Sequence, residues 1–166
     1  AGQSGWVSSL GEFVDRFERE FADFCASDHA VSMSNGTNAL FIALKALGLG
    51  PGDEVIVPAL TFAAVPAVVV HLGAAPVIVD AHPEYWCMDP AAVEKAITSR
   101  TKAIIVVHVY GHPADLNPIV DMAESNQISI VEDGAEAHGA RYKGKVVGSM
   151  GEVGCFSFYG NKILTT

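Results

Sequence analysis

Alternation of strands and helices is the feature of this sequence that most limits its fold. From residue 29 onward, short runs of branched apolar residues alternate with segments whose apolar residues recur at helical spacing. Strands that alternate with helices form a parallel sheet with helices on both faces. We therefore predict an α/β fold with a doubly wound, mostly parallel sheet, in a single domain over residues 1–166.

The expected elements follow from this alternation and from turn and capping residues. Asp89 and Pro90 supply an N-cap and a proline at the first helical position. Lys143 and Gly144 lie in the middle of a small expected hairpin. The expected strands are 29–33, 54–57, 75–79, 102–109, 128–133 and 153–158, and the expected helices are 10–26, 37–47, 62–72, 89–97 and 116–125.

The first expected helix carries an apolar face rich in phenylalanine. Ser9 and Glu12 have the spacing of a capping box, which predicts the start of this helix. We expect its four phenylalanines to lie in the core; they are Phe13, Phe17, Phe21 and Phe24.

Composition and charge exclude several classes of function. Half of the residues are hydrophobic, and the net charge of −9 offers nothing to nucleic acid or to an anionic membrane surface. The apolar stretch 55–79 is long enough to span a bilayer, but three prolines and Gly73 divide it, so we interpret it as strand, helix and strand. The three cysteines lack the spacing of a metal site or a disulfide framework, which favours a reducing, cytoplasmic location.

Residues that follow the strands are the best candidates for a site, because ligands of open α/β sheets bind beyond the carboxyl ends of the strands. Polar or aromatic residues occupy these positions throughout the chain. If the fold is correct, the segments that lie near one another are 34–37, 58–62, 108–112, 132–134 and 157–162.

The loop Ser34-Asn35-Gly36-Thr37 precedes an expected helix. Free backbone N–H groups at a helix N-terminus bind anions, and Gly36 would let a phosphate approach closely while Thr37 adds a hydroxyl. The alternative is an ordinary helix cap. The chain has neither a G-x-G-x-x-G nor a G-x-x-x-x-G-K-[ST] motif, so a dinucleotide or a nucleoside triphosphate is not expected.

Two charged residues at the same edge stand out. Asp133 ends an expected strand, where a carboxylate is either buried and paired or functional, and Glu132 could point to the other side. Lys162 follows an apolar strand, and partial desolvation there would favour a free amine that attacks carbonyls, although most turn lysines are simply solvated. A phosphate cradle, an acid and such a lysine are the parts of a pyridoxal phosphate site.

Histidines near this edge suggest a metal site only superficially. His108, His112 and Asp115 could form a cluster, but the His112-Pro113 step favours a loop rather than a helix, so no metal is expected. His138 is expected to be a polar residue whose hydrogen bonds are satisfied inside a loop.

Several stretches carry a resemblance to a known family. The stretches SNGTNAL, GPGDEVIVPALTFAA, VVHVYGHPADLNPI, VEDGAEAHGARYKGKVVGSMGEVGCFSF and YGNKILTT occur in this order. With them, the chain resembles the DegT/StrS-type nucleotide-sugar aminotransferases, which are fold-type I pyridoxal phosphate enzymes. SGWVSSLGEF, EDGAEAHG and FYGNK are most similar to the perosamine-synthase branch.

The resemblance implies roles for particular residues. Lys162 would carry pyridoxal 5′-phosphate as an internal aldimine, and Asp133 would face the pyridine nitrogen. Phe62 would stack on the ring, and Glu136 would lie near the ring hydroxyl, where many relatives carry glutamine. The phosphate would be held by Gly36, Thr37 and Ser157.

The implied reaction moves an amino group from an amino acid, expected to be glutamate, to a nucleotide-linked 4-keto-6-deoxy sugar. Relatives act as homodimers and extend beyond both ends of this chain, so residues 1–166 are expected to form an incomplete large domain without the small C-terminal domain, inactive alone. Three alternatives remain: a sugar 3-dehydratase, which carries histidine where this chain has Lys162; a non-catalytic or regulatory relative; and a binding domain without a cofactor.

Overall fold

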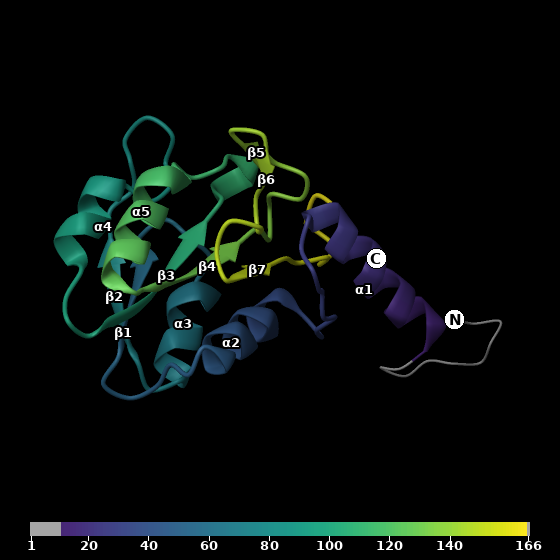
Figure 1. Cartoon of the computed structure of the whole chain (residues 1–166), viewed down its shortest axis with the longest axis horizontal. Coiled ribbons are helices and arrows are strands. Elements are labelled where there is room, and N and C mark those ends of the chain that lie inside the picture. Colours follow the sequence, from purple (N-terminus) through teal and green to yellow (C-terminus); the bar gives the residue numbers. More distant parts are fainter. Residues whose placement is uncertain (1–10, 166) are drawn as a thin grey trace.

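Five parallel strands form the central sheet of the computed structural model, which describes residues 11–165. The order across the sheet is β2-β1-β3-β4-β7, with every neighbouring pair parallel (Figure 1). The strands are β1 (Glu54–Pro58), β2 (Ala75–Val79), β3 (Thr101–Val107), β4 (Ser129–Asp133) and β7 (Val153–Cys155).

Helices cover both faces of this sheet. α2 (Gly36–Ala46) and α3 (Ala64–His71) lie on one face, and α4 (Pro90–Ala96) and α5 (Leu116–Asn126) lie on the other (Figure 1). The predicted doubly wound α/β fold is therefore confirmed, with element ends that shift by about a residue or two.

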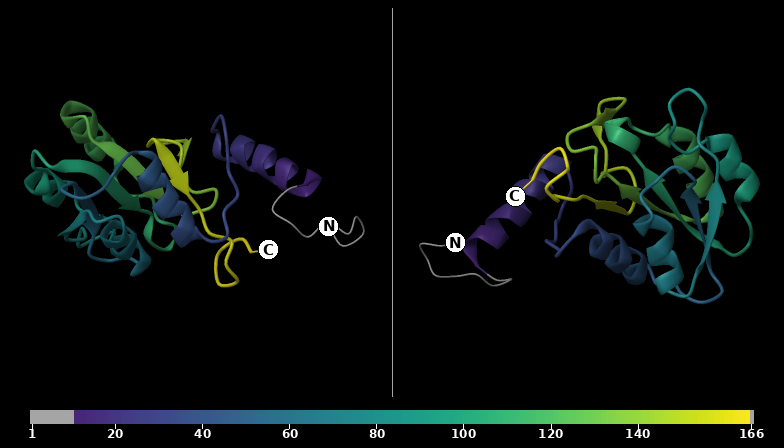
Figure 2. Two further views of the ribbon diagram at one scale, coloured as in Figure 1. Left: turned by 90° about the horizontal axis from the view of Figure 1, so that it is seen from below. Right: turned by 180° about the vertical axis from the view of Figure 1, so that it is seen from behind.

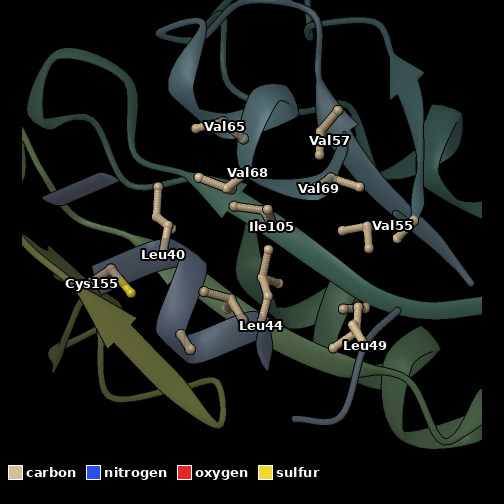
Figure 3. Packing of buried hydrophobic residues seen from close by; sticks show 14 residues of the cluster. Leu40, Leu44, Leu49, Val55, Val57, Val65, Val68, Val69, Ile105 and Cys155 are labelled. Atoms are coloured by element: carbon tan, nitrogen blue, oxygen red, sulfur yellow. The ribbon is translucent and has the colours of Figure 1, made fainter. Parts of the chain in front are cut away.

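Alternate residues of each strand enter opposite cores. On β3, Ala103 and Ile105 pack with α2 and α3, whereas Ile104 and Val106 pack with α4 and α5. Figure 3 shows the first core, in which Leu44 and its neighbours surround Ile105. Burying one such aliphatic side chain contributes about 1.5–3 kcal/mol, and a sheet covered on both faces accounts for the apolar character of the sequence.

Local signals in the sequence set several helix ends and turns. The Asp89 side chain accepts a hydrogen bond from the Ala91 N–H at 3.0 Å, and Pro90 opens α4 as predicted. The predicted hairpin forms from β5 (Arg141–Tyr142) and β6 (Lys145–Val146).

The long apolar stretch 55–79 forms β1, α3 and β2, as predicted. Among residues 11–165, no helix combines the length and the apolar character needed to cross a bilayer.

Two predicted strands differ from the structure. Residues 29–33 do not form a strand: the Ser32 N–H instead donates to a Glu18 carboxylate oxygen at 2.7 Å, and Val31 is exposed. An alternating pattern indicates a strand only where a neighbouring strand offers hydrogen bonds. The strand predicted for 153–158 ends at Cys155, because residues 156–158 leave the sheet and place two phenylalanine rings against α1.

The first helix, α1 (Glu12–Cys25), lies beside the sheet rather than on it (Figures 1 and 2). Ser9 of the predicted capping box lies outside the described residues, and Gly11 occupies the N-cap position without a side-chain cap. The prediction that all four phenylalanines are core residues is wrong: Phe13 and Phe24 are 50% and 46% exposed. Phe17 and Phe21 are half-buried, because they alone face the rings after β7.

Candidate active site

The carboxyl ends of β3, β4 and β7 are tied together by backbone hydrogen bonds. The His108 N–H donates to the Asp133 carbonyl at 3.1 Å, and the Gly134 N–H donates to the Cys155 carbonyl at 2.8 Å. The residues that follow these strands therefore start from one edge of the sheet. Segments 108–112, 132–134 and 157–162 are brought together there, as the sequence predicted.

The N-terminus of α2 meets the segment after β7. A Cβ atom at Gly36 would lie only 3.0 Å from the Cβ of Ser157, so the lack of a side chain at Gly36 permits this approach. Asn35 caps the helix by accepting the Asn38 N–H at 2.8 Å. The N–H groups of the first helical residues, Gly36 and Thr37, have no partner within a helix. Together with the buried Ser157 hydroxyl, they form a cradle suited to an anion.

Lys162 reaches into this edge from a turn. Its backbone N–H donates to the Tyr159 carbonyl at 2.8 Å, and its Nζ donates to Glu136 Oε1 at 3.0 Å. The Lys162 side chain is only 15% exposed, whereas that of Glu136 is 38% exposed. Lys162 is thus a largely covered amine rather than a solvated turn lysine.

Asp133 is buried at the end of β4. Its Oδ1 accepts the Ala135 N–H at 3.0 Å. Burial raises the pKa of the Asp133 carboxyl, and the Ala135 N–H and the nearby charge of Lys162 offset only part of this effect. A cation placed beside this carboxyl would favour its charged form.

Glu132, the preceding residue, points to the opposite side of β4. Both Glu132 and His108 are inaccessible to solvent, and His108 Nε2 lies 3.0 Å from Glu132 Oε2. Because the Ala114 N–H donates to His108 Nδ1 at 3.2 Å, the hydrogen of a neutral His108 is assigned to Nε2. Glu132 also accepts backbone N–H groups at 2.6–2.8 Å, from Gly148, Met150 and Gly151.

These donors decide the charge of Glu132. Burial alone would raise its pKa, but the hydrogen bonds from His108, Gly148 and Met150 hold the pKa below its ordinary value. Sequence reasoning recognised that Glu132 could face away from Asp133 but did not find this network. Strand alternation predicts the direction of the side chain, whereas its partners come from a distant turn.

The histidines and Asp115 do not converge. His108 is held by Glu132, the His112 ring lies 5.9 Å from that of Tyr85, and the Asp115 carboxylate accepts the hydroxyl of Tyr142. Within residues 11–165, no three His, Cys, Asp or Glu side chains are grouped as metal ligands.

His138 and Phe62 complete the candidate residues. The prediction that His138 is satisfied is wrong, since neither ring nitrogen has a hydrogen-bond partner in the described part of the chain. The ring lies 5.3 Å from that of Phe156 and 5.0 Å from that of Phe158, and burial, together with the charge of Lys162, lowers its pKa. Phe62 is 76% exposed, so no neighbour in residues 11–165 fixes its ring.

Two surface hollows lie away from these residues. One, of about 300 Å³, lies between β2 and α4 and includes Ile78 and Lys95. The other, of about 480 Å³, lies between α5 and the turn before β7 and includes Gln127 and Glu152. Neither contains a candidate residue, so the chemistry of the site depends on the strand ends.

Known proteins resemble this chain closely. GDP-perosamine synthase of Caulobacter vibrioides is 51% identical over 161 residues, which are 97% of this chain and 43% of that protein. The dTDP-3-amino-3,4,6-trideoxy-alpha-D-glucose transaminase of Streptomyces venezuelae is 50% identical over 93% of this chain and 41% of its own length. The chain thus spans less than half the length of these curated relatives.

A solved structure and a family profile agree with these relatives. Bacillus subtilis NtdA, solved with its bound cofactor PMP, superposes with a TM-score of 0.87 at 35% identity, covering 94% of this chain and 35% of NtdA. The profile of the DegT/DnrJ/EryC1/StrS aminotransferase family matches residues 1–166. This chain, with its parallel sheet and its cluster of strand-end residues, belongs to the DegT/DnrJ/EryC1/StrS aminotransferase family.

Proposed function

We propose that this protein is a pyridoxal phosphate-dependent aminotransferase that moves an amino group from an amino acid to a nucleotide-linked sugar. The observation that carries the proposal is the placement of Lys162, a largely covered amine at the carboxyl edge of the sheet, close to the buried Asp133. The names of the two relatives favour a nucleotide-linked sugar. A 4-keto-6-deoxy sugar as acceptor and glutamate as donor are the finer parts of the proposal.

The residues present fit this cofactor. The close approach of Gly36 to Ser157 leaves a cradle that a side chain would fill, and the first N–H groups of α2 favour a phosphate there. Thr37 supplies a further hydroxyl at this cradle. Phe62 is exposed and could cover a ring, and Glu136 lies beside Lys162, where the ring hydroxyl is expected.

When bound, pyridoxal phosphate supplies an aldehyde and an aromatic ring that accepts electrons. Lys162 Nζ would attach covalently to the aldehyde carbon and, once an amino substrate has replaced it, hold and move a proton as base and then as acid. The Asp133 carboxylate would hold a proton on the ring nitrogen. Burial disfavours the charged form of Asp133 and so raises its pKa. A cationic ring nitrogen beside the carboxylate would offset this cost, and the carboxylate would in turn stabilise the protonated nitrogen.

The remainder of the site is proposed to come from outside this chain. Since the relatives are more than twice as long, we propose that residues 1–166 form part of a large cofactor-binding domain that works with a small domain and in a homodimer.

The cysteines at 25, 87 and 155 are free and buried, which suits the reducing cytoplasm.

Covalent trapping tests the proposal. The protein, expressed from its complete reading frame, is treated with pyridoxal 5′-phosphate and then with borohydride, and the labelled peptide is identified by mass spectrometry. We expect the label on the peptide that contains Lys162, and no label in a Lys162→Ala variant. Label on Lys143 or Lys145 instead would refute the assignment.

The same protein preparation distinguishes the proposed aminotransferase from two alternative functions. A sugar 3-dehydratase would remove a hydroxyl without transferring nitrogen, and Lys162 argues against it because those enzymes carry histidine there. A non-catalytic relative would show no glutamate-dependent amination of a nucleotide-linked keto sugar, even with the cofactor attached.

A further inference from the structure

The contact between Lys162 and Glu136 brings a full negative charge to the candidate cofactor lysine. Lys162 Nζ lies 3.0 Å from Glu136 Oε1, and the lysine side chain is the more covered of the two. Resting on the function proposed above, we propose that Glu136 acts as a latch: it holds Lys162 in an ion pair that must open before Lys162 can attach a carbonyl cofactor.

Other charged groups near Lys162 do not replace this contact. Asp133 approaches from the end of β4 but is buried, with one oxygen on the Ala135 N–H. His138 lies on the same connection as Glu136, and burial lowers its pKa, which favours a neutral ring. Among residues 11–165, Glu136 is the only carboxylate within ion-pair distance of Lys162 Nζ.

The backbone around Glu136 is held in place by the loop after β3. A Cβ atom at Gly111 would lie 3.1 Å from the Glu136 carbonyl oxygen and 3.9 Å from Ile163 Cδ1, so Gly111 packs closely against both segments. The φ angle of Gly111 is +86°, which also favours glycine. The carboxylate thus extends toward Lys162 from a fixed backbone.

The chemistry of attachment explains why this pair matters. An ammonium group has no lone pair, so Nζ must lose a proton to solvent and leave the carboxylate before it attacks an aldehyde carbon. The new C=N bond forms as the carbonyl oxygen leaves as water, and no oxidant or reductant is required. A carboxylate stabilises the ammonium form, whereas the amide oxygen of glutamine could accept a hydrogen bond from Nζ without adding a charge.

The test compares rates of attachment in Glu136→Gln and in a matched control, Glu94→Gln, an exposed glutamate on α4. Each protein, expressed from its complete reading frame, is mixed with pyridoxal 5′-phosphate at neutral pH and quenched with borohydride at intervals, and label on Lys162 is quantified. Because a partly exposed ion pair is weak, we expect Glu136→Gln to attach the cofactor about two- to fivefold faster than wild type, and the control to match wild type.

Pyridoxal, which lacks the phosphate, serves as a second probe. Salt cannot change its rate of attachment by screening a phosphate charge, so any effect of salt reports on the protein. Raising sodium chloride should accelerate its attachment to wild type, by screening the ion pair, and change Glu136→Gln much less. If Lys162 is labelled in wild type but the cofactor attaches to Glu136→Gln no faster than to wild type, the latch is overturned and the proposed function is not. No label on Lys162 in wild type would overturn both the latch and the proposed function.

Discussion

His108 Nε2 lies 3.0 Å from a carboxylate oxygen of Glu132, and neither side chain is accessible to solvent. Glu132 also binds the backbone of the turn that leads into β7. One carboxylate therefore joins the segment after β3, the end of β4 and the approach to β7. Asp133 itself ends β4, and the turn that carries Lys162 follows β7.

Replacing Glu132 should destabilise the fold. Glu132→Gln would turn an amide NH₂ toward N–H donors, leaving buried donors unsatisfied, so we expect a loss of about 3 kcal/mol in the free energy of unfolding. Urea unfolding measures it, with Glu124→Gln on the exposed side of α5 as the control. A loss no larger than that of the control would show that the network is not a structural requirement.

Acid should weaken the folded state through the same residue. The pKa of Glu132 is lower in the folded protein than in the unfolded chain, so its contribution is complete above the unfolded pKa, near 4.3, and is lost as pH falls through the folded value. Urea unfolding at a series of pH values should show this loss in wild type and a shallower one in Glu132→Gln. Parallel pH profiles would contradict the prediction.

Asp133→Asn should separate attachment of the cofactor from its chemistry. Asparagine keeps the size of the side chain but cannot stabilise a cationic ring nitrogen by charge. We expect label on Lys162 after borohydride, together with loss of most glutamate-dependent amination. Asp80→Asn, an exposed residue after β2, is the control and should retain activity. Near-normal turnover in Asp133→Asn would refute the proposed role.

Gly36→Ala should weaken binding of the phosphorylated cofactor. The added methyl group would press against Ser157 at 3.0 Å, and overpacking of this kind costs about 1–3 kcal/mol. Equilibrium titration with pyridoxal 5′-phosphate measures the change, and Gly50→Ala, whose nearest neighbour would be 4.0 Å away, is the matched control. If both variants bind equally, Gly36 does not shape the cradle.

The buried thiols should resist alkylation in the folded protein. Burial raises the pKa of Cys25 to about 11, and burial together with the charge of Asp133 raises that of Cys155 to about 12. Because the thiolate is the reactive form, iodoacetamide near neutral pH should modify these residues only after denaturant is added. Rapid modification of Cys155 without denaturant would mean that β7 opens readily.

Much of the fold could be predicted because each strand and helix has its own apolar periodicity and is bounded by turn and capping residues. The position of Asp133 at the ligand edge follows from its place at the end of a strand, and that of Lys162 follows from the segment that continues beyond β7. The exposure of Phe13 and Phe24 could not be predicted, because periodicity identifies the apolar face of a helix but not what covers it. The partners of Glu132 were equally hidden, since they are backbone groups of a turn whose approach depends on the whole fold.

The aromatic contacts of α1 connect the start of the chain to the lysine turn. The Phe17 and Phe21 rings lie 5.3 Å and 5.2 Å from that of Phe158, and Ser157, just before it, faces Gly36. A shift of α1 along its axis would therefore displace Phe158, and with it Ser157 in the phosphate cradle and the turn that carries Lys162. A partner that displaced this helix would therefore change the geometry of the candidate site without contacting its residues.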